Sequence, residues 1–313
     1  MWSKISFIIC CVLVFVTVAT SHLWGFTGTD STLIDSRKIS FSIAKESSFN
    51  DDYQKIILEI KKKKFNNLPL DECIVAIGKL FVGKPYIDKS LETTLDESET
   101  VCNLSGFDCV TYFESSWAMA TTVKKITKPT YSDYGSQLTN HRYRSGIRKG
   151  FQSRLHYTSD YFYDNALRGN LKAMTKSIGE KYAKLETKPI NFMTTHPNLY
   201  KQLKDDPAMV AKMDSIEKMM KERGGFYFIP KEHVAEIEKG IHGGDLIGIT
   251  TSIAGIDCSH TGIAVKGDDG RIHFMHASSA MHKVIISPTP LADYLAGNAK
   301  QTGIIVYRPL ETK

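Results

Sequence analysis

The sequence predicts an α+β fold in which helices come first and an antiparallel sheet follows. In the first part of the chain, apolar residues recur at steps of three and four, as they do in amphipathic helices. After residue 245 the pattern changes to short runs rich in β-branched residues, separated by turn signals, which is typical of strands. This segregation of helices and strands along the chain favours the α+β arrangement.

The first 64 residues resemble an export signal followed by a tether. Residues 1–21 combine a positive flank at Lys4, an apolar run over 5–19 and a small-residue exit, which is typical of a secretory signal peptide. The apolar run is short for a membrane span, and an uncleaved anchor is the alternative. Residues 22–64 then supply a polar tether and a helix over 51–64. We expect a periplasmic or secreted protein that meets the membrane only through its signal peptide.

Residues 65–313 are enough for one large domain, with an inserted segment at about 125–240. The hydrophobic fraction of 42% and charged fraction of 24% are ordinary for a globular protein. The net charge of +6 is compatible with an anionic partner. Because no basic block is interleaved with aromatic residues, we expect no nucleic-acid partner.

A helix that begins at Cys109 is the centre of the predicted site. An amphipathic helix over 70–81 and a polar loop over 88–100 precede it. Either Ser105 or Asp108 can cap its first turn. The helix N-terminus favours an anion, and the thiolate is the nucleophilic form of cysteine. The alternative is a buried cysteine that only fills space. The apolar face of this helix comprises Val110, Phe113, Trp117 and Ala120.

The inserted segment carries two dense clusters of Arg, His and Tyr residues, over 140–146 and 153–161. Such side chains can orient a sugar or a carboxylate. The alternative is a surface held by Arg–Tyr and Arg–Asp contacts. A helix over 207–223 then carries a methionine stripe, which we assign to the core.

The last third of the chain predicts strands over 245–250, 261–265, 271–276, 283–286 and 303–308, with a tight turn at 267–270 and a short helix over 291–296. His260 begins the second of these strands, and His276 lies near the end of the third. Because side chains alternate between faces, the register decides whether the two imidazoles meet. If the numbers of residues paired across these two strands sum to 536 or 538, both histidines lie on the same face of the sheet. If they sum to 537, the histidines lie on opposite faces.

A cysteine and two histidines in this arrangement predict a nucleophilic site. His260 would take the proton of Cys109, and His276 would hold the orientation of His260. No C-x-x-C pair is present, so we expect no zinc knuckle. A cysteine nucleophile needs no metal or cofactor, and we expect none. If Cys109 stays reduced, at most one disulfide can form, and the sequence does not decide which. The other cysteines of the mature chain are Cys73, Cys102 and Cys258.

Five motifs in order resemble the NlpC-type cell-wall hydrolases, which are papain-like cysteine peptidases and amidases. They lie at residues 83–86, 106–109, 244–246, 260–263 and 274–278. The run 107–111 with Glu114, the clusters over 142–146 and 153–157, and the run 276–279 are similar more narrowly to the N-acetylmuramoyl-L-alanine amidase-like branch. The resemblance covers roughly residues 65–309. It implies a papain-like core of helices, a nucleophile-bearing helix and an antiparallel sheet, with a large inserted substrate-binding segment.

The resemblance also implies roles for individual residues. Cys109 matches the nucleophile, His260 the general base and His276 the residue that orients it. Tyr86 matches a tyrosine whose hydroxyl reaches toward the nucleophile. Residues assigned to substrate binding are Asp108, Arg144, Arg154, His156, Tyr157 and Ser278.

The function implied is an exported cysteine amidohydrolase of peptidoglycan or muropeptides that cleaves the bond between N-acetylmuramic acid and L-Ala. Two alternatives stay open: a γ-D-glutamyl-diamino acid endopeptidase of the same superfamily, and an inactive protein that only binds cell wall. Transfer of the acyl group to an amine is a third outcome that the residues do not exclude.

Overall fold

The computed structural model describes residues 50–92 and 97–311. The expected signal peptide and most of the expected tether lie outside these ranges. A helix over 50–62 begins the described part, close to where the sequence predicts one. In the two described ranges, no helix is both long enough and apolar enough to span a bilayer.

The fold is α+β, with helices first and an antiparallel sheet after them, as predicted. Each pairing between its strands is antiparallel, and the order along the sheet is β2-β3-β8-β4-β5-β6-β7. The strands are β1 (Leu171–Ala173), β2 (Lys184–Glu186), β3 (Phe226–Pro230), β4 (Leu246–Thr251), β5 (Cys258–Lys266), β6 (Ile272–Ser278), β7 (Lys283–Pro290) and β8 (Gln301–Pro309).

Strand β8 joins the segment at about 125–240, which we expect to be an insertion and call the inserted segment, to the rest of the sheet. One edge of β8 pairs with β4, and its other edge pairs with β3 near one end and with β1 near the other. Strands β1, β2 and β3 all come from the inserted segment, and the sequence predicted none of them. They are three to five residues long, too short for a periodic pattern, and they become strands only through long-range pairing.

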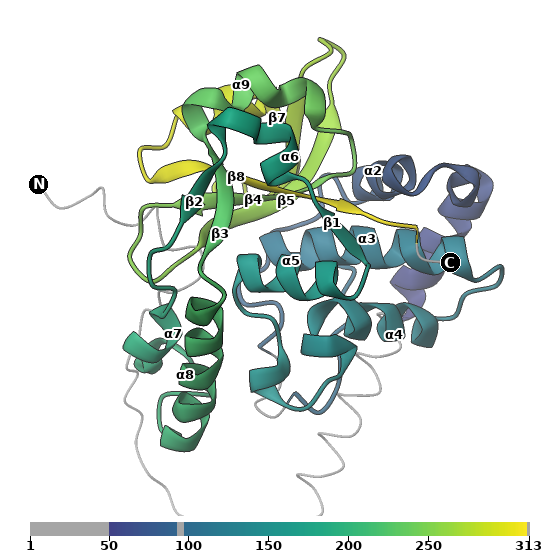
Figure 1. Ribbon diagram of the computed structural model, residues 1–313. Coiled ribbons are helices and arrows are strands. Elements are labelled where there is room, and N and C mark those ends of the chain that lie inside the picture. The colour runs from purple at the N-terminus through teal and green to yellow at the C-terminus, as the bar shows by residue number, and fades with distance from the viewer. Residues whose placement is uncertain (1–49, 93–96, 312–313) are drawn as a thin grey trace, which may run out of the picture.

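Helices cover both faces of the sheet (Figure 1). One apolar core joins α2 and α3 to one face, through residues such as Ile263 and Met275. A second core joins α9 and α10 to the other face, through neighbours such as Ala264 and Phe274. The alternation of adjacent residues between the two cores follows from the period of two in a strand. The helices are α2 (Leu70–Leu80), α3 (Cys109–Lys125), α4 (Tyr131–Arg142), α5 (Thr158–Leu167), α6 (Thr175–Gly179), α7 (Phe192–Thr195), α8 (Pro207–Glu222), α9 (Val234–Ile237) and α10 (Leu291–Ala296).

Helix α8 lies beside α7 and forms a third, smaller core (Figure 1). Met213 and Met220 are buried in it, and Met209 and Ile216 pack against it. The methionine stripe is therefore core, as predicted.

Helix α3 is the central helix of the larger core. It packs against α2, α4, β5 and β6, and residues on all of its sides are buried. It is therefore less amphipathic than the single apolar face predicted from the sequence. This burial fixes the position of its first residue, Cys109, relative to the sheet.

Candidate active site

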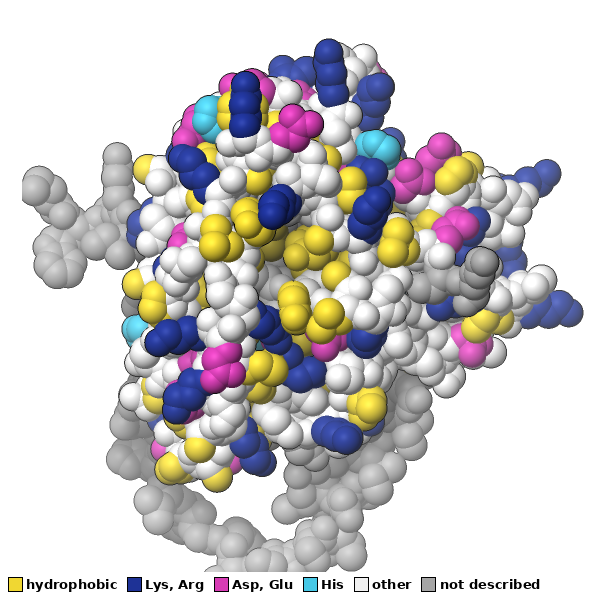
Figure 2. Space-filling view, in the orientation of Figure 1, with side chains coloured by type: hydrophobic (Ala, Val, Ile, Leu, Met, Phe, Trp, Pro, Cys, Tyr) yellow, Lys and Arg dark blue, Asp and Glu magenta, His cyan; other side chains and the backbone are white. Residues whose placement is uncertain are grey.

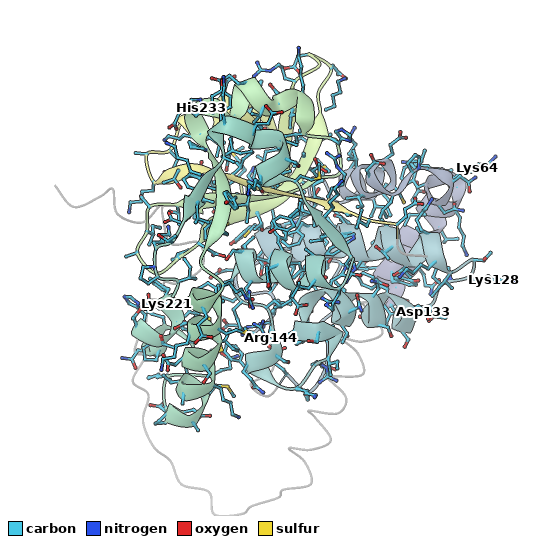
Figure 3. All side chains as sticks on the ribbon, in the orientation of Figure 1. Lys64, Lys128, Asp133, Arg144, Lys221 and His233 are labelled. Carbon is cyan, nitrogen blue, oxygen red and sulfur yellow. The ribbon has the colours of Figure 1, made fainter. Side chains whose placement is uncertain are left out.

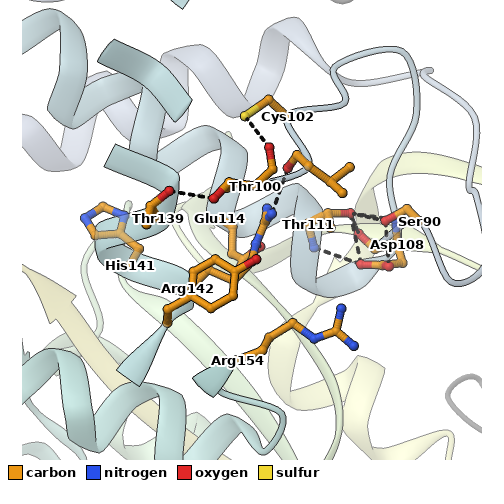
Figure 4. A network of polar contacts seen from close by, with 12 residues as sticks. Ser90, Thr100, Cys102, Asp108, Thr111, Glu114, Thr139, His141, Arg142 and Arg154 are labelled. Atoms are coloured by element: carbon orange, nitrogen blue, oxygen red, sulfur yellow. Dashed lines mark hydrogen bonds and ion pairs between the residues drawn. The ribbon is translucent and has the colours of Figure 1, made fainter. Parts of the chain in front are cut away.

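Asp108, not Ser105, caps the helix that begins with Cys109. Its Oδ1 accepts the backbone N–H of Thr111 (2.8 Å), and the Thr111 hydroxyl accepts the backbone N–H of Asp108 (3.0 Å). The Ser90 hydroxyl donates to Asp108 Oδ2 (2.8 Å; Figure 4). These reciprocal bonds satisfy donors at the helix start and hold the backbone on both sides of Cys109.

Cys109 borders a pocket of about 140 Å³. Its side chain is only 4% exposed, and no disulfide links it to Cys73, Cys102 or Cys258. All four cysteines are buried. Residues that line this pocket include Asp88, Asp108, Phe113, Glu114, Arg142, Arg154, His156, Thr158 and Tyr161.

Tyr86 lies on the segment that ties the start of α3 to the sheet. Its backbone forms a parallel bridge with Phe107, and its N–H donates to the carbonyl of His282 (3.0 Å). Pro85 pairs with Lys283, which in turn pairs with Ser278 at the end of β6. Backbone bonds therefore connect the residues before Cys109 to the end of the strand that carries His276. The Tyr86 side chain is half-buried against the larger core.

The two histidines meet. Strands β5 and β6 pair Ile263 with Met275 and Ala264 with Phe274, so the residue numbers of each pair sum to 538. This is one of the two even registers that the sequence allowed. His260 Nε2 lies 2.6 Å from His276 Nδ1, and the rings are nearly perpendicular. Both rings also contact Phe274.

Burial keeps both imidazoles neutral at neutral pH. It lowers the pKa of His260 to about 4. It also lowers the pKa of His276 well below its ordinary value, and the neighbouring His260 lowers it further. A neutral pair shares one proton between the facing nitrogens, so the short contact is a hydrogen bond between two uncharged rings.

The imidazoles line a second pocket, of about 190 Å³, together with Ser278, Tyr294 and Lys300. Ser278 is buried, and its hydroxyl accepts the N–H of Met281 (3.1 Å). The structure therefore places Ser278 beside the histidines, while Cys109 borders the neighbouring pocket described above.

Helix α5, which lines the cysteine pocket, contacts β5, the strand that carries His260. Thr158, which lines the cysteine pocket, lies next to the Cys258 thiol. Ser159 donates its N–H to the carboxylate of the buried Asp257 (2.5 Å). At this point a bulge between Cys258 and His260 interrupts the pairing of β5 with β4, and bulges re-aim side chains next to functional sites.

Two of the predicted binding residues in the inserted segment line the cysteine pocket. Arg154 Nη1 lies 2.8 Å from Glu97 Oε1, and the hydroxyl of Tyr143 donates to the other oxygen of that carboxylate (2.6 Å). His156 donates from Nε2 to the carbonyl of Phe151 (2.8 Å). Burial holds the pKa of His156 well below its usual range. The imidazole of His156 is therefore neutral at neutral pH.

Arg144 and Tyr157 do not line the cysteine pocket. The guanidinium of Arg144 pairs with buried Asp160. The Tyr157 hydroxyl donates to Glu217 (2.7 Å) and accepts the N–H of Met193 (2.9 Å). For these residues the structure favours the alternative interpretation, in which Arg–Asp and tyrosine contacts hold the inserted segment together.

A buried ion pair that the sequence did not predict lines the cysteine pocket. Arg142 Nε lies 3.0 Å from Glu114 Oε2, and both side chains are at least 98% buried. Burial raises the pKa of the Glu114 carboxyl, although Arg142 opposes the shift. Glu114 follows Phe113 on a helix that the sequence places against the core, and a buried carboxylate requires a partner. The sequence therefore indicated that Glu114 is paired. Figure 4 shows Arg142 beside Glu114, with Arg154 nearby.

In the described ranges, no group of three or more His, Cys, Asp and Glu side chains is arranged to hold a metal ion. The polar groups at the two pockets include a thiol, three imidazoles and guanidinium–carboxylate pairs. These groups support proton transfer and nucleophilic attack.

Known proteins resemble this chain over most of its length. The family model "AmiA-like: N-acetylmuramoyl-L-alanine amidase-like" matches residues 76–304. A crystal structure of an N-acetylmuramoyl-L-alanine amidase from Bacteroides uniformis is 34% identical, with a TM-score of 0.70, covering 77% of this chain and 99% of that one. No curated protein matched the chain.

Two further solved structures are similar. A putative xylanase from Bacteroides fragilis is 34% identical, with a TM-score of 0.67, covering 74% of this chain and 98% of that one. A Legionella pneumophila protein described with the family model DUF1460 shares the fold at 23% identity and a TM-score of 0.61, covering 87% of this chain and 96% of that one. The family match spans well over half of the residues, including Cys109 and both histidines. The chain therefore belongs to the AmiA-like family of N-acetylmuramoyl-L-alanine amidase-like proteins.

Proposed function

We propose that this protein is a cysteine amidohydrolase that cleaves the amide bond between N-acetylmuramic acid and L-Ala in peptidoglycan fragments. The observation that carries the proposal is the 2.6 Å contact between His260 and His276, beside a helix that begins with Cys109. Family membership supports the amidase chemistry. The finer fold assignment is a papain-like NlpC-type core over residues 65–313, with the segment at about 125–240 inserted.

The first step is the activation of Cys109 by His260. His276 occupies Nε2 of His260, so Nδ1 is the nitrogen that takes the thiol proton. His276 must then accept at Nδ1 and carry its own proton at Nε2. Once protonated, His260 donates from Nε2 to His276, and this bond stabilises the imidazolium that forms. His276 acts as a positioning residue in this scheme.

The thiolate then attacks the carbonyl carbon of the amide. The N–H groups that a helix start directs outward stabilise the oxyanion, and the Tyr86 hydroxyl adds a donor. His260 gives its proton to the leaving amine, which is the amino group of L-Ala. Water hydrolyses the resulting thioester with His260 as the base, and this restores the thiol.

Arg154, His156 and Asp108 border the pocket where the substrate would lie, and Ser278 borders the imidazoles. Arg154 brings a cation that Glu97 holds in place. Because the carboxylates of a muropeptide are anionic, this guanidinium is suited to orient one of them.

The mechanism requires the Cys109 thiol to reach His260 around the end of β5, where the bulge lies. Alkylation by iodoacetamide tests this requirement, because only the thiolate reacts quickly. At neutral pH, where His260 is a neutral base, we expect Cys109 to be alkylated faster in wild type than in the His260→Ala variant, because His260 accepts the thiol proton during the attack. Equal rates in both proteins would exclude a Cys109–His260 pair.

Mass spectrometry of muropeptide digests tests the bond assignment. A free stem peptide together with a free sugar supports the amidase. A shortened peptide still attached to the sugar identifies instead the γ-D-glutamyl-diamino acid endopeptidase. Retention of the protein on cell wall without any product would identify a binding protein, and an acyl product formed with added amine would identify transfer.

The substrate class also implies a location. Peptidoglycan fragments arise outside the cytoplasmic membrane, so we propose a periplasmic or secreted protein that is exported by residues 1–21. Cell fractionation of the tagged full chain tests this, and recovery from the cytoplasm alone would contradict it.

A further inference from the structure

A larger pocket lies within the inserted segment, outside both pockets of the candidate active site. Its volume is about 410 Å³, which is in the range of roughly 300–1,000 Å³ typical of small-molecule sites. It lies between α5, β3 and the end of α8. Figure 2 shows hydrophobic and basic side chains gathered around a hollow near the centre of this face.

The lining of this pocket is basic. Lys176, Lys188, Lys221 and Arg223 border it, and none of its lining residues is acidic. Arg223 shares buried Asp160 with Arg144. The three lysines make no ion pair within the described residues, so their charge is available to a ligand. Figure 3 shows Lys221 near the end of α8.

Aromatic rings hold two of these cations over the pocket. Lys176 Nζ lies 4.7 Å from the centre of the Tyr227 ring, and the Arg223 guanidinium lies 4.2 Å from that of Tyr163. Both tyrosines are exposed. A ring under each cation limits its motion and favours an anionic ligand that carries some apolar surface.

The pocket adjoins the candidate active site at two points. Ser159 lines it, and the preceding Thr158 lines the cysteine pocket. Lys188 lines it as well, and its Nζ donates to the carbonyl of Thr251, which borders the imidazole pocket. This pocket therefore lies next to both pockets of the candidate active site, on the other side of residues 158–159 and 188.

We infer that this pocket binds the carboxylate-bearing end of the stem peptide, remote from the cleaved bond. The inference rests on the proposed function. In a muropeptide, the lactyl carboxyl of the sugar is consumed in the amide bond, so the remaining carboxylates lie on the peptide. Four extended residues span roughly 13 Å, so the far end of the stem peptide lies well outside the pocket that holds the cleaved bond.

The test pairs a change in the protein with a matched change in the substrate. The variant Lys176→Gln/Lys221→Gln removes two cations from the lining. Lys218→Gln is the control, because Lys218 lies one turn earlier on α8 and pairs with Asp214 outside the pocket. The substrates are N-acetylmuramoyl tetrapeptides that end either in a carboxylate or in the neutral carboxamide.

For the carboxylate substrate, we expect the double variant to raise KM threefold to tenfold and to leave kcat unchanged, because the contact lies far from the reacting bond. For the carboxamide, wild type and double variant should have the same KM. Lys218→Gln should match wild type with both substrates. Calorimetry should show the same loss for the free tetrapeptide on a Cys109→Ala background.

Hydrolysis with an unchanged KM in the double variant would overturn the inference while the proposed function stands. An equal rise in KM for both substrates would also overturn it, since the end carboxylate would then play no part. If wild type hydrolyses neither substrate, the proposed function fails. The calorimetry on the Cys109→Ala background then decides on the pocket by itself.

Discussion

The inserted segment and the sheet, which both border the candidate active site, differ in how their buried polar groups are paired. Buried arginines of the inserted segment are matched by carboxylates from the preceding part of the chain, as in the pairs Arg142–Glu114 and Arg154–Glu97. On the sheet, His260 and His276 contact each other, and burial rather than a carboxylate partner sets the pKa of His260.

This difference suggests that the ion pairs support the stability of the fold, whereas the two imidazoles support catalysis. Removing one partner of a buried ion pair leaves the other charge uncompensated, which strongly destabilises the fold. A neutral imidazole pair can accept a proton and release it again, which an amidohydrolase requires. We therefore expect changes in the inserted network to lower stability, and changes at the sheet to lower the rate.

The largest effect should come from Cys109. Replacement by Ala removes the covalent route, so kcat should fall at least a thousandfold while the free energy of unfolding changes by only about 1 kcal/mol. Cys102→Ala is the matched control, because Cys102 is also a buried cysteine near the start of α3, and its activity should stay within threefold of wild type. More than a tenth of wild-type activity in Cys109→Ala would contradict the mechanism.

Next in size is the loss of the Arg142–Glu114 pair. Arg142→Met leaves Glu114 buried without its cation and should lower the free energy of unfolding by about 3–5 kcal/mol. Chemical denaturation measures this. The double variant Arg142→Met/Glu114→Leu should recover most of the loss. If the single variant is as stable as wild type, the pair does not support the fold.

His276→Ala should lower kcat by about 10- to 100-fold, because His260 then loses the acceptor that orients it. His276→Asn keeps a polar side chain and should recover part of the rate, while KM stays unchanged in both variants. A purely structural role would instead predict equal losses for both substitutions, together with a lower unfolding temperature.

Substitution of Tyr157 tests whether this residue supports the fold or contacts the substrate. Tyr157→Phe removes the hydrogen bond to Glu217 and should cost about 1–3 kcal/mol of stability. Because Tyr157 does not line the cysteine pocket, KM should not change. A raised KM at full stability would return Tyr157 to the substrate site, as the sequence first suggested.

The smallest effect concerns pH. The pKa of His260 is lowered to about 4 by burial, so the neutral base is present above that value and lost as the pH falls through it. We expect the acidic limb of kcat/KM to have its midpoint below pH 5, since this limb reports the free enzyme. A midpoint at 6.5, the ordinary value for histidine, would mean that His260 is exposed to solvent or is not the base.

Most of the secondary structure follows from local pattern. The periodicity predicted α2, α3, α8, α10 and the strands from β4 to β8, because each shows a regular apolar spacing. It did not predict α4 and α5, whose sequences mix polar and aromatic residues. The short strands β1, β2 and β3 carry no such signal. Likewise, the sequence could not separate Arg154, which borders the pocket, from Arg144, which does not. Both stand in similar clusters, and only their carboxylate partners differ.

The sequence alone determined the chemical groups and their carriers: a cysteine at a helix start, two histidines on adjacent strands, and a family pattern linking them. It left the strand register undecided between even and odd sums, because either pairing buries apolar residues on one face or the other. Only the tertiary structure fixed the register of β5 and β6, in which the numbers of paired residues sum to 538. This register brings the imidazoles together. The tertiary structure also joined the inserted strands to β8 and closed the basic pocket beside α5. These outcomes depend on contacts between residues far apart in the chain, and no local spacing encodes them.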